Sequence, residues 1–139
     1  MACFLKEKFS PILETQHRIL LNDILTSGGC AVHVRRGDLA VENPYYGCPT
    51  SLEYFRDAIC CVKGLGLCPD MKFFFFSDDP DYCERNLLPL VGSNGMVCRL
   101  NGSDKGYIDL YLISKCRWII SSQGSLGVFG ALFSGGSQP

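Results

Sequence analysis

Val32-His33-Val34-Arg35-Arg36-Gly37-Asp38 is the stretch that decides the fold: an apolar strand, beginning at Cys30, that ends in two arginines, a glycine and an aspartate. Uninterrupted apolar strands are typical of the middle of a parallel sheet. Adjacent guanidinium groups repel each other and are tolerated best where an anion neutralises both, and their planar forks bind phosphate oxygens in pairs. The stretch therefore indicates either a site for the diphosphate of a sugar nucleotide or an ordinary strand followed by a solvated turn.

The composition is that of one folded domain. The chain has 139 residues, of which 47% are hydrophobic and 12% aromatic, enough for a buried core. Its net charge of -1 argues against general affinity for nucleic acid or an anionic membrane, so an anion site must be local. We find no apolar run of membrane-spanning length, and the charged segment Lys6-Glu7-Lys8 does not resemble a signal peptide.

Nine cysteines are many for this length, but their number is odd and their spacings contain no C-x-x-C motif. Several lie within apolar segments, where a free cysteine behaves as a small hydrophobic residue. We predict that they are mostly reduced and buried in a cytoplasmic protein, and a metal site is the weaker alternative.

Strands and helices alternate along the sequence. Ser10-Pro11 has the pattern of a helix start, and Thr50-Ser51-Leu52-Glu53 has the form of a capping box. Helices are predicted at 10–28, 50–64, 79–88, 109–116 and 125–133, and strands at 30–34, 71–76, 96–100 and 118–120. This alternation predicts a parallel α/β sheet with helices on both faces.

Three of the predicted strands end in polar residues, namely Arg35 to Asp38, Ser77-Asp78-Asp79 and Ser121 to Ser125. In sheets of this class, ligands bind outside the carboxyl ends of the strands. The three polar strand ends are therefore expected to form one binding site on one rim of the sheet.

Three motifs in order resemble those of the α-1,2-fucosyltransferases, glycosyltransferase family 11. They are H-V-R-R-G-D at 33–38, F-F-F-S-D-D at 74–79 and D-L-Y-L-I-S-K-C at 109–116, and the segment 47–59 matches as well. The resemblance runs from about Phe9 to the C-terminus. The loop at 123–132 departs from the usual bacterial form and is similar to the animal branch of the family.

The resemblance implies a Rossmann-like domain that is one half of a GT-B glycosyltransferase. Residues 1–139 correspond to the C-terminal half, which binds the donor GDP-fucose, and the N-terminal acceptor domain is absent. The implied reaction is inverting, metal-independent transfer of L-fucose from GDP-β-L-fucose to the 2-OH of a galactoside, with no cofactor besides the donor. The chain resembles a fragment of such an enzyme, so the resemblance does not decide whether it catalyses transfer without the acceptor domain.

By resemblance, the catalytic residues are Arg35, Arg36 and Asp38. The residues expected to bind the donor are His33, Arg35, Arg36, Gly37, Ser77, Asp78, Asp109, Ser122, Gln123, Gly124 and Ser125. Structural alternatives remain for three residues: a hydrogen-bonded core histidine for His33, a helix cap for Asp79, and a simple complement to the helix dipole for Asp109.

Other functions stay open at this point. The chain could be a fucosyltransferase of another linkage, a protein O-fucosyltransferase, or a non-catalytic GDP-sugar-binding remnant. The expected partners are GDP-fucose and a galactose-containing glycan, with no nucleic acid. The expected location is the cytoplasm, with peripheral attachment to a membrane as an option, although the family also contains Golgi membrane members.

Overall fold

Strands and helices alternate along the chain, as predicted. The computed structural model describes residues 11–36, 49–66, 68–100 and 102–122, together with Gly130 and Leu132. In chain order the elements are α2 (Thr15–Ser27), β1 (Cys30–Val34), α3 (Leu52–Gly64), β2 (Phe73–Ser77), α4 (Pro80–Tyr82), the π-helical turn η1 (Cys83–Leu87), α5 (Leu88–Val91), the 3-10 turn η2 (Gly92–Asn94), β3 (Gly95–Val97), the 3-10 turn η3 (Ser103–Lys105), α6 (Gly106–Lys115) and β4 (Trp118–Ser121).

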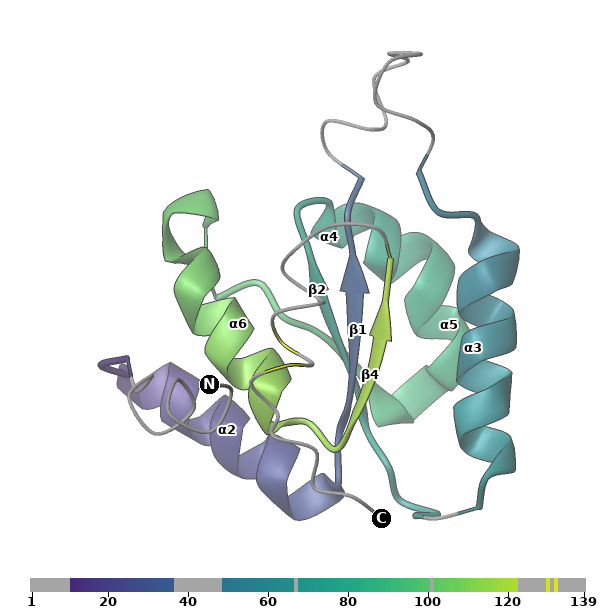
Figure 1. The fold of residues 1–139 in the computed structure, drawn as a ribbon, viewed down its shortest axis with the longest axis horizontal. Helices are drawn as coiled ribbons and strands as arrows, with labels where there is room; N and C mark the ends of the chain where they lie inside the picture. Colours follow the sequence, from purple (N-terminus) through teal and green to yellow (C-terminus); the bar gives the residue numbers. More distant parts are fainter. Residues whose placement is uncertain are drawn as a thin grey trace.

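The described strands form one parallel sheet in the order β3-β2-β1-β4 (Figure 1). β1 pairs with β2 in the register Val34 to Ser77, and with β4 in the register His33 to Ser121. The chain therefore moves from β1 outward to β3 and then returns to the other side of β1 for β4. This is the α/β, Rossmann-like architecture expected from the sequence, and its switch in strand order lies between β1 and β4.

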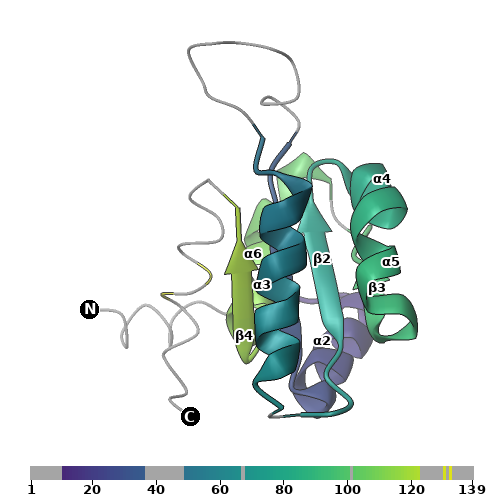
Figure 2. The ribbon, with the colours of Figure 1, turned by 90° about the vertical axis from the view of Figure 1, so that its right-hand side faces the viewer.

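Helices cover both faces of the sheet, which confirms the prediction. On one face α3, η1 and α5 pack over Val32, Val34 and Phe75, and on the other α2 and α6 pack over Ala31, Phe74 and Phe76. Figure 2 shows α3 in front of the strands, with α4 and α5 beside it and α2 and α6 behind. Burial on both faces explains why β1 and β2 are uninterrupted apolar runs rather than alternating sequences.

Two glycines follow α2: Gly28 ends the helix, and Gly29 leaves room for the Phe74 ring of β2. Gly28 adopts φ 63°, a left-handed conformation that terminates the helix. At Gly29 an added Cβ would lie 2.7 Å from the Phe74 ring, so a side chain at this position would displace the core.

Several predicted boundaries were wrong. α2 begins at Thr15, because Glu14 and His17 form a reciprocal capping box that starts the helix there. The N-cap of α3 is Ser51, whose hydroxyl accepts from the Tyr54 N–H, so Glu53 lies one position too early to complete a capping box with it. β3 ends at Val97 instead of Leu100, and the helix that follows β2 continues through the π-helical turn to Val91. Of the helix predicted at 125–133, only Gly130 and Leu132 lie within the described residues.

The prediction for the cysteines holds for only part of them. Cys30, Cys83 and Cys116 are free and buried, whereas Cys60 and Cys61 are free and exposed on α3. A helix needs buried positions on only one stripe, and these two positions fall on the solvent side. None of the helices in the described ranges is both long and apolar enough to cross a bilayer.

Candidate functional site

The carboxyl ends of β2, β1 and β4 lie side by side, as the sequence predicted. β1 has β2 on one side and β4 on the other, so Arg35 and Arg36 leave the sheet between Ser77-Asp78 and Ser121-Ser122. The site is thus built on the inner strand at the switch in strand order, the usual place for a ligand in an open parallel sheet.

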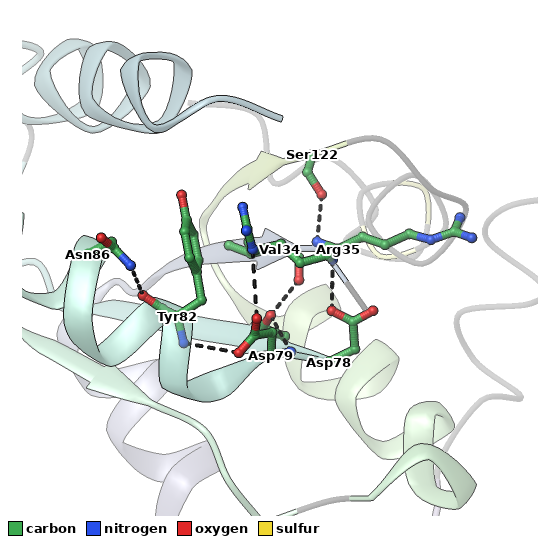
Figure 3. Close-up of polar contacts among 9 residues, drawn as sticks. Val34, Arg35, Asp78, Asp79, Tyr82, Asn86 and Ser122 are labelled. Carbon is green, nitrogen blue, oxygen red and sulfur yellow. Dashed lines mark hydrogen bonds and ion pairs between the residues drawn. The ribbon is translucent and has the colours of Figure 1, made fainter. Parts of the chain in front are cut away.

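Hydrogen bonds from both neighbouring strands hold the backbone of the arginine pair. The Arg35 N–H donates to Ser122 Oγ at 2.9 Å, and the Arg36 N–H donates to Asp78 Oδ1 at 2.8 Å. Ser77 Oγ donates to the Val34 carbonyl at 2.6 Å. These contacts, drawn in Figure 3, fix the path of the chain at the point where the arginine side chains begin.

The same side chains also order the neighbouring strand ends. Ser77 Oγ accepts from the Asp79 N–H at 2.9 Å, and the Ser122 N–H donates to the His33 carbonyl at 2.9 Å. Ser122 is buried, so its hydroxyl would otherwise carry a desolvation cost without a partner. Ser77, Asp78 and Ser122 therefore have an internal structural role at this rim, whether or not they also meet a ligand.

The two arginine side chains diverge, as alternation along a strand predicts. The Arg36 guanidinium carbon lies 3.7 Å from the centroid of the Tyr82 ring, and its Nε is 3.7 Å from Asp79 Oδ2. The Arg35 side chain extends away from Tyr82 and Asp79 (Figure 3). The site thus presents two cationic groups on different sides of one strand end, rather than two parallel forks.

His33 lies beneath this rim, on the face that α2 and α6 cover. The residue is 7% exposed, and its Nδ1 has no hydrogen-bond partner among the described residues. Burial lowers the pKa of His33, and the nearby Arg35 charge lowers it further, against an opposing effect of the Asp78 carboxylate. The sequence left open that His33 is a hydrogen-bonded core histidine. Among the residues that the structure describes, its Nδ1 atom lacks the hydrogen bond that this alternative requires.

The structural role predicted for Asp79 is confirmed. Asp79 Oδ1 accepts from the Tyr82 N–H at 3.1 Å and caps the helix that Pro80 begins. Asp109 lies in the first turn of α6, where its carboxylate complements the positive end of the helix dipole. Burial raises the pKa of the Cys98 thiol, and the charge of Asp109 raises it further.

Some predicted site residues lie outside the described residues: Gly37, Asp38, Gln123, Gly124 and Ser125. Two aromatic residues at the rim were missed. Tyr82 contacts Arg36, and the Tyr54 hydroxyl donates to the Ser121 carbonyl at 2.9 Å. The signal for Tyr82 was its position three residues after the capping Asp79, which places it within one helical turn of the strand end.

The described residues contain no group of three His, Cys, Asp or Glu side chains that could hold a metal ion. The arginine pair supplies two cationic groups at the carboxyl end of β1. Guanidinium groups held at the end of a strand can bind a diphosphate through charge-assisted hydrogen bonds.

Comparison with known proteins gives two matches. The sequence model described as "Glycosyl transferase family 11" matches residues 4–138. An alpha-1,2-colitosyltransferase of Escherichia coli is 28% identical over 132 residues, which cover 91% of this chain. The match spans only 44% of the length of that relative.

Proposed function

This chain belongs to glycosyltransferase family 11, and on that premise we propose that it is the donor-binding part of an α-1,2-fucosyltransferase. Its ligand in this proposal is GDP-fucose, bound at the carboxyl ends of β2, β1 and β4. The acceptor is a galactose-containing glycan, which receives L-fucose on its 2-OH. The match to less than half of the relative's length makes the binding of the donor, rather than turnover, the primary property to test.

The observation that carries the proposal is the arginine pair on its fixed backbone. A diphosphate gains negative charge as the bond to the sugar breaks, and preorganised donors stabilise that charge best when they need no rearrangement. The two hydrogen bonds at 2.9 and 2.8 Å hold the main chain of Arg35 and Arg36 before any ligand arrives. Because the side chains diverge, we assign them to different oxygens of the diphosphate.

The nucleoside is assigned to the same rim. His33, Ser77 and Asp78 are the candidates for guanine or ribose, and Ser122 lies on the opposite side of β1 near the diphosphate. Burial lowers the pKa of His33, which favours its neutral form. Asp78 Oδ1 accepts from the Arg36 N–H, and a comparison of asparagine and alanine variants tests whether the carboxylate also reaches the nucleotide.

The chemistry is inverting displacement at the anomeric carbon through an oxocarbenium-like transition state. The acceptor oxygen forms its bond to that carbon as the bond to the β-phosphate oxygen breaks, and the electron pair leaves with GDP. The hydroxyl proton of the acceptor passes to a base or to solvent in the same step. Arg35 and Arg36 stabilise the leaving GDP, and this role requires no metal ion.

The printed name of the relative gives the same α-1,2 linkage but a colitosyl group, so the transferred sugar is part of the test. Transfer assays with fucosyl and colitosyl donors on a galactoside, followed by linkage analysis of the product, distinguish the donor sugar and the linkage. A product on a protein hydroxyl would favour protein O-fucosylation instead.

Calorimetric titration tests the donor site directly. We expect the chain to bind GDP and GDP-fucose, and to bind GMP at least about tenfold more weakly because the second phosphate is missing. ADP serves as the control for the base. A folded chain that binds neither GDP nor GDP-fucose would overturn the proposal, and binding without transfer to a galactoside would favour a non-catalytic remnant.

A further inference from the structure

Among the described residues, the guanidinium of Arg36 is in contact with the face of an aromatic ring. Its carbon lies 3.7 Å from the centroid of the Tyr82 ring, which is direct stacking contact. Asp79 is close, but the separation of 3.7 Å between Oδ2 and Nε is an ion pair without a hydrogen bond. Arg36 Nε has no hydrogen-bond partner among the described residues. The ring therefore sets the plane of the guanidinium.

Tyr82 is itself fixed on both sides in the chain. Its N–H donates to Asp79 Oδ1 at 3.1 Å, and its carbonyl accepts from Asn86 Nδ2 at 3.1 Å. The π-helical turn Cys83–Leu87 begins directly after it. Figure 3 shows the ring beside the end of β1, with Asp79 to its lower right and Asn86 to its left. The start of α4 therefore holds the Tyr82 ring beside the end of β1, in contact with Arg36.

A ring and a carboxylate hold an arginine with different consequences. The five N–H groups of a guanidinium lie in its plane, whereas stacking uses its face. A carboxylate in that plane would occupy the same donors that a phosphate needs. A ring orients the cation and leaves its in-plane fork for an anion.

We propose that Tyr82 is the positioning residue for Arg36, holding its guanidinium by stacking so that the fork meets the diphosphate of the donor. This inference rests on the proposed function and adds to it a residue outside the arginine motif. Tyr82 acts through Arg36 and does not itself touch the nucleotide. Its hydroxyl has no part in the proposal.

The experiment compares Tyr82→Phe, which keeps the ring, with Tyr82→Leu, which removes it. Tyr111→Leu on α6 is the matched control, because Tyr111 is also half-buried and also carries a cation, with Lys115 Nζ 5.1 Å from its ring centroid. Each variant is titrated with GDP and with guanosine, which has the same base and ribose but no phosphate.

We expect Tyr82→Phe and Tyr111→Leu to bind GDP within about twofold of the wild type, and Tyr82→Leu to bind it about tenfold more weakly. Guanosine affinity should be unchanged in all three. Wild-type affinity for GDP in Tyr82→Leu would overturn the inference while leaving the proposed function intact. Equal losses for GDP and guanosine would also overturn it, because they would indicate general disruption. A wild-type chain that does not bind GDP would overturn both.

A second series keeps the packing and changes only the ring electronics. The series starts from the Tyr82→Phe variant and replaces its ring with phenylalanine analogues that carry more and more fluorine. Fluorination weakens the negative face of the ring at nearly constant size. GDP affinity should fall stepwise along the series, whereas thermal stability should not follow the same order. Constant GDP affinity along the series would overturn the stacking role even if Tyr82→Leu does not fold.

Discussion

The backbone N–H of Arg35 donates to the hydroxyl of Ser122 at 2.9 Å, across 87 positions of sequence. The two residues follow neighbouring strands, β1 and β4, so this contact joins the first strand of the sheet to the last described one. The Arg35 N–H therefore depends on the hydroxyl of Ser122, an uncharged residue that is not among the predicted catalytic residues.

Replacing Ser122 with alanine should weaken both the fold and the site. The Arg35 N–H loses its acceptor in a partly buried position, which typically costs about 1 to 3 kcal/mol of unfolding free energy. GDP affinity should fall as well, because the Arg35 backbone is released. Urea unfolding and GDP titration measure the two effects. Ser114→Ala is the matched control, since Ser114 is equally buried at 7% but its hydroxyl bonds within its own helix, to the Tyr111 carbonyl. An equal loss of GDP affinity in that control would contradict the prediction.

Truncating either arginine of the pair should reduce GDP affinity strongly. Loss of a charged partner in a desolvated site typically costs about 2 to 5 kcal/mol. Calorimetry on Arg35→Ala and Arg36→Ala measures the loss. Arg99→Ala is the control, because Arg99 is an exposed arginine that pairs with the exposed carboxylates of Asp81 and Glu84 on the helix after β2. Unchanged affinity in both site variants would exclude the diphosphate role.

Asp78 allows the internal role to be separated from ligand contact. Asp78→Asn keeps an acceptor oxygen for the Arg36 N–H, whereas Asp78→Ala removes it. From this geometry we expect GDP affinity to be nearly unchanged in the asparagine variant and to fall about tenfold in the alanine variant. Both are measured by titration. Equal losses in the two variants would instead support the direct contact with the nucleotide predicted from the sequence.

His33 should make the fold sensitive to acid. Burial lowers its pKa below the ordinary value of 6.5, so the unfolded chain binds more protons than the folded one as the pH falls through 6.5. The free energy of unfolding should therefore decrease as the pH falls from 7 toward the folded-state pKa. Thermal melts between pH 7.5 and pH 5 compare the wild type with His33→Asn, in which this part of the slope should be absent. Parallel curves would show that His33 is not the responsible group.

The cysteines should react in two classes. Cys60 and Cys61 are exposed, whereas burial raises the pKa of Cys30 to about 12 and that of Cys83 to about 11. Because the thiolate is the nucleophile, we expect a maleimide to label Cys60 and Cys61 in the folded chain, and Cys30 and Cys83 only in urea. Peptide mapping by mass spectrometry measures both. Rapid labelling of Cys30 under native conditions would contradict the packing of β1.

The strands and their polar ends could be predicted because burial on both faces leaves a plain signature. The apolar runs of β1 and β2 end where Arg35 and Ser77 begin to meet water, and that transition marked the rim correctly. The shared rim then followed from the rule that the carboxyl ends of parallel strands lie at one edge, whereas the strand order and the register come from the structure. The start of α2 could not be predicted in the same way, because Glu14 and His17 compete with Ser10-Pro11 as a helix start and the pairing of two side chains decides between them.

The contacts around Arg36 were beyond the sequence for a geometric reason. Tyr82 meets the guanidinium only because Asp79 caps a helix that turns back toward β1, and the two residues are separated by most of the β1-α3-β2 unit. Asp78 likewise reads as a ligand residue in sequence, while the structure shows its carboxylate on the Arg36 backbone. The polar residues after each apolar run identified the rim. The role of each side chain at the rim depends on contacts between residues far apart in the sequence, which local patterns do not show.

The position of β1 between β2 and β4 also sets when the site can form during synthesis. Chains emerge from the ribosome in order, and Ser122 is synthesised 87 residues after Arg35. Contacts of such high sequence separation form late, since the intervening chain must first be ordered. A nascent chain that has not yet released β4 therefore carries the arginines without their anchor. Affinity for the nucleotide should arise only after β4 has joined the sheet, which makes ligand binding a reporter of that folding step.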